Sequence, residues 1–181
     1  MYLILISGLP GSGKTTLGRE IAARYQSPLI AKDLIKEPLM DVLNQDRKIG
    51  SRLLSDASFA ALFQVAAELV RAKTSLVLEG NFRPGEHEAP VERLIKIKPD
   101  LELIQILCRV SDDDRMHRLQ ARRASGERHS GHADLGTGVF ADRLSDTFLD
   151  LPGSRWIAEG ATGQDQILAR LDDKIPPFRR W

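Results

Sequence analysis

Three glycines, a lysine and a threonine near the N-terminus have the spacing of a phosphate-binding loop. The segment from Gly8 to Thr15 fits the pattern G-x-x-x-x-G-K-[ST], known as the P-loop. The apolar run Tyr2–Ile6 before it predicts a buried strand, and the apolar residues after it recur at helical spacing. Because the motif needs this setting, it predicts a nucleotide site rather than an incidental glycine-rich turn.

Each position of the loop has a chemical reason. Glycines allow backbone angles that turn N–H groups inward around phosphate oxygens, next to the positive end of the following helix. Lys14 is placed to reach the β- and γ-phosphates of ATP, and the Thr15 hydroxyl to hold Mg²⁺. The residues expected to bind the phosphates are Gly8, Pro10, Gly11, Ser12, Gly13, Lys14, Thr15 and Thr16.

A carboxylate follows the second predicted strand. Asp33 comes two residues after the short apolar run Leu29–Ala31. In a phosphoryl-transfer enzyme a carboxylate there can accept or orient the proton of the attacking hydroxyl. Aspartate is equally suited to capping a helix, and the spacing alone does not decide between the two roles.

A second carboxylate, Glu79, ends the third predicted strand, Leu76–Leu78. At this position a carboxylate can hold Mg²⁺ through water, or bind substrate together with Asn81 and Arg83. The alternative is a solvated carboxylate at the end of a strand.

Three arginines share one face of a strongly charged helix that Ser111 is expected to cap. Arg115, Arg118 and Arg122 are spaced i, i+3 and i+7. Guanidinium groups fit phosphate oxygens and stack on bases, so this helix and the Gly- and His-rich stretch 126–139 predict a lid over ATP, at about residues 112–138. The alternative is a solvated helix whose arginines pair with the aspartates of its first turn.

His129, His132 and Asp134 invite a metal interpretation. They lie in a stretch expected to be a flexible loop, without helical spacing or a cysteine. A lid contact or a solvent-facing loop is the better interpretation.

Strand and helix patterns alternate along the chain, which predicts a parallel sheet with helices on both faces and ligands at the carboxyl ends of the strands. Further strands are expected at 101–108 and 156–158. Helices are expected at 13–25, from 33 to about 42, from a cap at Ser55 to Val70, after Pro90, at 111–126, around 140–148 and around 167–175, with a turn at 160–163.

The composition fits one α/β domain over residues 1–181. Hydrophobic residues make up 42% and the formal net charge is +1, so no basic excess points to nucleic acid. The single cysteine, Cys108, excludes an internal disulfide and fits a reducing compartment. No signal peptide and no stretch long enough to cross a bilayer are expected, which favours the cytoplasm.

With these residues in place, the chain resembles the small P-loop kinases of the adenylate-kinase-like group, and most closely the bacterial AAA_33 family. Relatives in that group are gluconate kinase, chloramphenicol phosphotransferase, zeta toxins and the polynucleotide kinase domain. The matching segments begin at Ser7 (SGLPGSGKTT), Ala31 (AKD), Glu79 (EGNFRPG) and Ser125 (SGERH). The resemblance implies a three-layer P-loop fold with a five-stranded parallel sheet in the order 2-3-1-4-5.

The resemblance also implies roles. Asp33 matches the catalytic carboxylate of polynucleotide kinase. Arg118 would stack on adenine, Arg122 would meet the transferring phosphate, and Thr162 would edge the adenine pocket. The residues with which adenylate kinases bind AMP are not found here, which disfavours AMP as the acceptor.

We therefore expect an ATP- and Mg²⁺-dependent kinase that phosphorylates a hydroxyl of a small molecule. Lys14, Asp33, Arg118 and Arg122 are the expected catalytic residues. The acceptor is expected to contact Asp33, Glu79, Asn81 and Arg83, and Mg²⁺ to lie at Thr15 and Glu79. Two alternatives are a polynucleotide 5′-hydroxyl kinase and a non-catalytic ATP-binding regulatory module. The sequence names neither the acceptor nor the oligomeric state.

Overall fold

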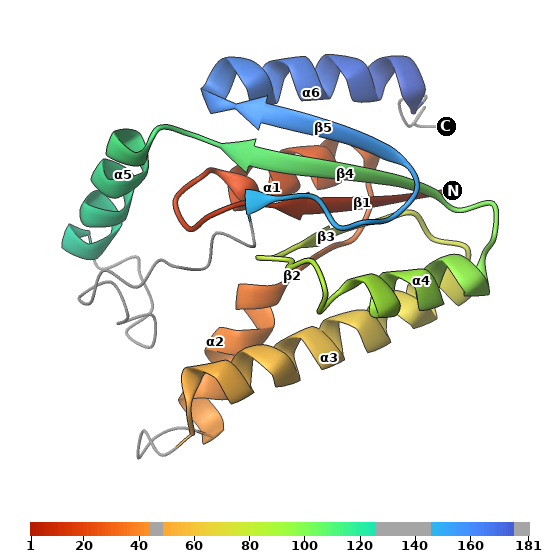
Figure 1. Cartoon of the computed structure of the whole chain (residues 1–181), viewed down its shortest axis with the longest axis horizontal. Helices are drawn as coiled ribbons and strands as arrows, with labels where there is room; N and C mark the ends of the chain where they lie inside the picture. The colour runs from red at the N-terminus through yellow and green to blue at the C-terminus, as the bar shows by residue number, and fades with distance from the viewer. Residues whose placement is uncertain (44–48, 126–145, 176–181) are drawn as a thin grey trace.

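A single parallel sheet forms the centre of the molecule (Figure 1). The structure, a computed structural model, describes residues 1–43, 49–125 and 146–175. Its strands lie in the order β2-β3-β1-β4-β5, which confirms the predicted order. The strands are β1 (Tyr2–Ser7), β2 (Leu29–Ala31), β3 (Leu76–Glu79), β4 (Glu102–Arg109) and β5 (Ser154–Glu159).

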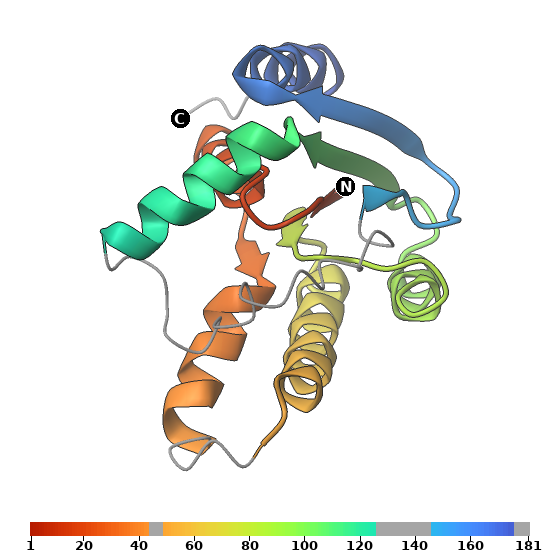
Figure 2. The ribbon, with the colours of Figure 1, turned by 60° about the vertical axis from the view of Figure 1, so that its left-hand side comes forward.

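Helices cover both faces of this sheet (Figures 1 and 2). Helices α1 and α6 pack on one face, and α3 and α4 pack on the other. The helices are α1 (Lys14–Tyr25), α2 (Lys32–Leu43), α3 (Ser51–Arg71), α4 (Glu88–Ile97), α5 (Asp112–Ala124) and α6 (Gly160–Lys174).

The central strand β1 explains why the apolar run at the N-terminus is continuous. Leu3 and Leu5 point into the core under α3 and α4, whereas Ile4 and Ile6 point into the core under α1 and α6. A strand that is buried on both faces needs apolar side chains at every position. All paired strands run parallel, so their carboxyl ends meet at one edge, where the P-loop begins.

The helix predicted to be capped by Ser55 begins earlier. It starts at Ser51 after Gly50, and Ser55 is buried inside it. Leu54 lies in this extra turn and is buried, so core packing extends the helix beyond the predicted cap. By contrast, Ser111 does cap α5, because its Oγ accepts the backbone N–H of Asp114 at 3.1 Å.

The turn predicted at 160–163 is wrong, because these residues form the first turn of α6. Gly163 lies so close to β5 that a Cβ there would be 2.9 Å from the carbonyl carbon of Ala158. A small residue at this position permits helix packing rather than a turn. The helix predicted around 140–148 falls largely outside the described residues, and the chain from 146 to 150 is not α-helical.

Helix α3 corrects the expectation that no stretch could cross a bilayer. By length and composition this helix passes that test. Its large apolar residues nevertheless pack under the sheet, with Phe59, Leu62 and Val70 all buried. We therefore describe α3 as a core helix.

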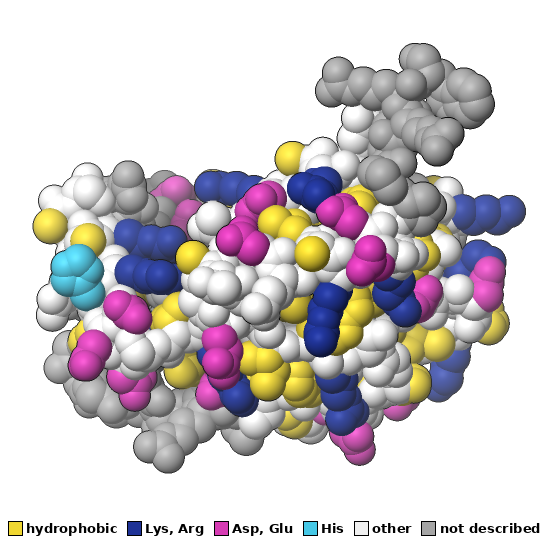
Figure 3. All heavy atoms as spheres, turned by 90° about the horizontal axis from the view of Figure 1, so that it is seen from above, with side chains coloured by type: hydrophobic (Ala, Val, Ile, Leu, Met, Phe, Trp, Pro, Cys, Tyr) yellow, Lys and Arg dark blue, Asp and Glu magenta, His cyan; other side chains and the backbone are white. Residues whose placement is uncertain are grey.

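The surface on the α6 side carries acidic and basic side chains next to one another (Figure 3). No single-sign patch dominates this face, in keeping with the formal net charge of +1.

The position of α3 predicts a contrast between two of its residues. Leu62 is fully buried, whereas Val65 on the same helix is 49% exposed. Leu62→Ala should lower the free energy of unfolding by about 2–5 kcal/mol, through lost transfer energy and a cavity. Val65→Ala should change it by less than about 0.5 kcal/mol. Urea denaturation of both variants tests this, and equal effects would contradict the packing described.

Candidate active site

Two glycines of the P-loop have positive φ angles that disfavour any other residue, and one of them also lies against a neighbouring backbone. Gly8 has φ 137°, and a Cβ there would overlap the carbonyl oxygen of Cys108 at the end of β4. Gly13 has φ 94°, and a Cβ there would lie 2.6 Å from Nε2 of Gln164 on α6. Both positions therefore require glycine, which keeps the loop backbone open toward a ligand.

The polar side chains of the loop are arranged for anionic oxygens. Lys14 Nζ donates a hydrogen bond to the carbonyl oxygen of Leu9 at 3.1 Å, so its ammonium lies over the loop. The Ser12 hydroxyl is buried and has no hydrogen-bond partner within the described part of the chain. Helix α1 begins directly at Lys14, so its N-terminus faces the same place. These features fit nucleotide phosphates.

A cavity of about 550 Å³ opens in front of the loop. Its lining comes from the P-loop and α1, the start of α2, the ends of β2 and β3 with the residues that follow them, and Leu119 and Arg122 of α5. It brings together most of the residues singled out in the sequence: Pro10, Gly11, Gly13, Lys14, Thr15, Thr16, Asp33, Glu79, Asn81 and Arg122.

Glu79 and Thr15 form the deepest pair in this cavity. The Thr15 hydroxyl donates to Glu79 Oε2 at 3.1 Å, and the glutamate is only 4% exposed. Burial raises the pKa of Glu79, while the nearby Lys14 ammonium and the Thr15 hydrogen bond oppose that shift. A hydroxyl and a carboxylate supply the hard oxygen ligands that Mg²⁺ prefers, so the residues present fit this ion.

Asp33 also lines this cavity, and it lies inside the first turn of α2 rather than before the helix at the N-cap position. It is the second residue of α2, and its side chain is about half exposed. The ammonium of the buried Lys32 donates to Asp33 Oδ1 at 2.9 Å. This ion pair fixes the orientation of the carboxylate at the cavity.

The arginines of α5 divide between the P-loop and the cavity. Arg115 is buried, pairs with Asp112 at 2.9 Å, and packs against Gly11. Arg118 Nη1 lies 3.5 Å from the carbonyl oxygen of Gly11, and Arg122 lines the cavity. Pairing with a first-turn aspartate therefore applies to Arg115, and the other two face the P-loop and the cavity.

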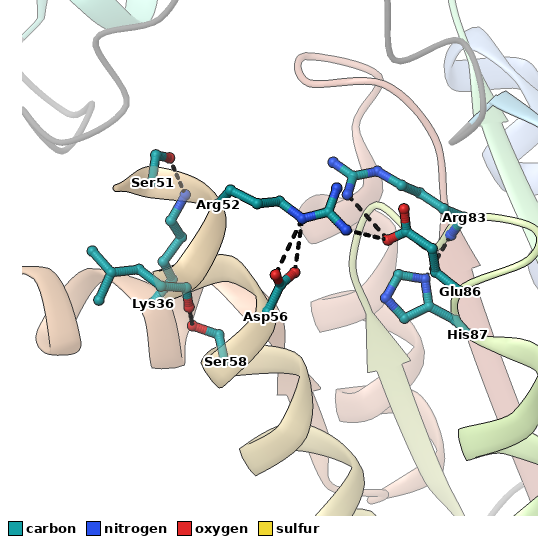
Figure 4. A network of polar contacts seen from close by, with 9 residues as sticks. Lys36, Ser51, Arg52, Asp56, Ser58, Arg83, Glu86 and His87 are labelled. Atoms are coloured by element: carbon teal, nitrogen blue, oxygen red, sulfur yellow. Dashed lines mark hydrogen bonds and ion pairs between the residues drawn. The ribbon is translucent and has the colours of Figure 1, made fainter. Parts of the chain in front are cut away.

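Arg83, predicted to contact the acceptor, does not line the cavity. It is buried and bonded to Glu86 at 3.3 Å, and Glu86 also binds Arg52 of α3 at 2.9 Å (Figure 4). The Arg83 backbone N–H donates to Nδ1 of His87, a ring whose burial lowers its pKa and keeps it neutral. Arg83 therefore ties the loop after β3 to α3.

Thr162 is exposed in the first turn of α6 and also lies outside the cavity lining. His129, His132 and the second part of the predicted lid, residues 126–138, fall outside the described residues. Among the described residues, no group of three or more His, Cys, Asp or Glu could hold a metal ion. Cys108 is buried, which raises the pKa of its thiol to about 12 and makes it an unreactive core residue.

Seven lining residues were not among the predicted site residues: Arg19, Ala31, Lys32, Leu34, Glu37, Gly80 and Leu119. Helical spacing could have found two of them. Arg19 follows Thr15 by four residues on α1, and Glu37 follows Asp33 by four on α2, so each shares a helix face with a predicted site residue.

Comparison with known proteins agrees with this geometry. The sequence model of the AAA_33 family, described as an AAA domain, matches residues 3–141. The chain is 26% identical over 151 residues to an adenylate kinase of Sulfurovum sp. (strain NBC37-1), covering 78% of this chain and 76% of that protein.

Two solved structures extend the comparison. A candidate kinase from Chloroflexus aurantiacus j-10-fl matches with a TM-score of 0.83 at 28% identity, covering 95% of this chain and 97% of that one. The APS kinase of Mycobacterium tuberculosis, solved with AMPPNP and APS, matches with a TM-score of 0.56 at 18% identity, over 94% and 95% of the two chains. The fold is therefore that of kinase-like P-loop proteins.

The raised pKa of Glu79 predicts a pH-dependent cost in stability. Between the ordinary pKa of a glutamate and the raised one, the folded chain binds more protons than the unfolded chain. Stability then falls as pH rises through this interval. Without nucleotide or Mg²⁺, Glu79→Gln should be more stable than the wild type at about pH 8 and lose this advantage at about pH 4.

Thermal unfolding at the two pH values measures this difference. An advantage of Glu79→Gln that was the same at both would contradict the assigned cause. The same variant should bind Mg²⁺–nucleotide more weakly, which separates stability from function at this residue.

Proposed function

The chain belongs to the AAA_33 family, and from this premise we propose that it is an ATP- and Mg²⁺-dependent phosphotransferase acting on a hydroxyl of a small molecule. The observation that carries the proposal is one cavity whose lining includes Lys14 and Thr15 at the P-loop and Asp33 at the start of α2. A phosphate chain held by the P-loop would present its last phosphorus to an alcohol that lies beside Asp33.

Binding of the triphosphate falls to the loop and the residues around it. Lys14, bonded to the Leu9 carbonyl in this structure, would exchange that bond for the β- and γ-phosphates. Thr15 and Glu79 would hold Mg²⁺, which neutralises charge on the same phosphates. The orphaned Ser12 hydroxyl would gain a partner there.

The proposed transfer step uses Asp33 as the proton acceptor and the arginines of α5 as charge partners. The oxygen of the acceptor hydroxyl forms a bond to the γ-phosphorus while the bond between that phosphorus and the oxygen of ADP breaks. The hydroxyl proton passes to Asp33, whose carboxylate is oriented by Lys32 at 2.9 Å. Arg122 lines the cavity where it can neutralise charge on the moving phosphoryl group, and Arg118 would contact the adenine side.

The similar proteins support a kinase rather than a binding module. The relatives described above include an adenylate kinase and a candidate kinase, and the APS kinase was solved with an ATP analogue. A single domain and a cytoplasmic location stay predictions from the sequence.

An ATP phosphoryl-transfer screen tests the proposal directly. Sugars, nucleosides, antibiotics, hydroxy acids and oligonucleotides serve as acceptors. Lys14→Ala should weaken ATP binding and abolish turnover with every acceptor, because it removes the ammonium that holds the β- and γ-phosphates. ATP binding without transfer to any acceptor would contradict the proposed activity, and transfer to oligonucleotides alone would favour the polynucleotide alternative.

Asp33→Asn separates binding from chemistry. Loss of the general base should lower kcat by a factor of about 10²–10⁴. The Kd for ATP should be unchanged, because Asp33 belongs to α2 and not to the P-loop that binds the phosphates. Single-turnover kinetics and calorimetric titration with ATP measure the two quantities.

The matched control is Asp173→Asn, an exposed aspartate on α6 outside the cavity. It removes the same charge and should leave kcat unaltered. Because Asp33→Asn also deprives the buried Lys32 of its partner, thermal unfolding should accompany the kinetics. Full transfer by folded Asp33→Asn would remove this residue from the mechanism.

A further inference from the structure

One basic side chain in the lining of the cavity has no role in the proposed phosphoryl transfer. Four basic residues line it: Lys14, Arg19, Lys32 and Arg122. The proposed function uses Lys14 and Arg122 on phosphate, and Lys32 is paired with Asp33. Arg19 has no hydrogen bond or ion pair with any other residue in the part of the chain that the structure describes.

Arg19 lies farther from the phosphate loop than Lys14 does, on the side of the cavity where the acceptor is proposed to bind. It lies five residues after Lys14 on α1, which is roughly 7 Å farther along the helix axis from the phosphate loop. Its neighbour Gly18 packs so closely on β2 that a Cβ there would lie 3.3 Å from Cδ1 of Leu29. Strand β2 leads directly into α2, so Arg19 lies beside the wall that carries Asp33.

The carboxylates of α2 that line the cavity already have partners, so the charge of Arg19 is available to a bound ligand. Asp33 is bonded to Lys32, and Glu37 also has an interaction within the protein. Leu34 lines the same wall and is 53% exposed, which offers apolar surface to a short carbon chain. A planar guanidinium favours carboxylate and phosphate groups, which it binds through two parallel hydrogen bonds.

We propose that the phosphoryl acceptor is a small hydroxy acid whose anionic group, a carboxylate or a phosphate, is bound by Arg19. Its hydroxyl lies at Asp33 and its carbon chain contacts Leu34. This inference rests on the proposed kinase activity and narrows the class of its acceptor.

Pairs of acceptors that differ in the anionic group test the inference. D-glycerate and glycerol 3-phosphate are compared with glycerol, and D-gluconate with D-sorbitol, under saturating ATP and Mg²⁺. The anionic member of a pair should have a kcat/KM higher by at least about tenfold, because a charge-assisted contact contributes that much discrimination. The comparison of D-glycerate with glycerol 3-phosphate tells which anionic group Arg19 takes.

Arg19→Gln should raise KM for the anionic acceptor by about 10–100-fold, with kcat and the KM for ATP little changed. Arg93→Gln is the matched control, because Arg93 is exposed on α4, outside the cavity, and carries the same charge. Transfer to neutral acceptors only, or an unchanged KM in Arg19→Gln, would overturn the inference while leaving the kinase activity intact.

A binding measurement keeps the inference testable if no acceptor is phosphorylated. Wild-type protein saturated with AMPPNP and Mg²⁺, which fill the phosphate loop, is titrated calorimetrically with D-glycerate, D-gluconate and glycerol 3-phosphate. Binding that is lost in Arg19→Gln and kept in Arg93→Gln would support the anion subsite even without turnover. No binding by any of the three anions, or equal binding by both variants, would overturn it.

Discussion

The close approach of the P-loop backbone to its neighbours is the constraint on which the site depends. Gly8 touches the end of β4, Gly11 lies under Arg115 of α5, and Gly13 meets Gln164 of α6. Elements that are far apart in the sequence thus pack against one loop, and its glycine positions leave little room for a larger residue. Its backbone is held in shape before any ligand arrives, so ordering the loop adds little to the entropic cost of binding phosphate.

Buried ionisable side chains are the second feature of the site, and their burial lowers the stability of the fold. Glu79 is buried beside Thr15, at the cost of a raised pKa, and Lys32 is buried beside Asp33. Ionisable groups with little access to water destabilise a fold unless a partner compensates. Glu79 and Lys32 both line the cavity, which agrees with buried charges kept for chemistry, whereas the other buried charged residues Lys36, Arg83 and Arg115 lie outside its lining.

The sequence predicted the fold better than the walls of the site. Strong local signals, such as the P-loop and the apolar strands, led to the parallel sheet and to Lys14, Thr15 and Glu79 at one edge, and the family resemblance supplied the strand order. Weaker signals misled. The small residues at 160–163, two of them glycines, look like a turn, but they form the start of α6 packed on β5. Arg83 looks like a substrate contact, but the structure bonds it to Glu86 and His87. Arg19 shares a helix face with Thr15, but only the fold shows that this face lines a cavity.

The strand β2 has only three residues and one neighbour, β3, at the border of the sheet. The segment that carries Asp33 and Leu34 therefore follows a strand at the edge of the sheet, whereas the P-loop and Arg19 follow the central strand β1. Mutations or insertions in α2 and α3 can change the surroundings of Asp33 and Leu34 without disturbing β1 and the P-loop. Such an architecture lets descendants of one ancestor diversify toward new metabolites while they inherit the same phosphate donor.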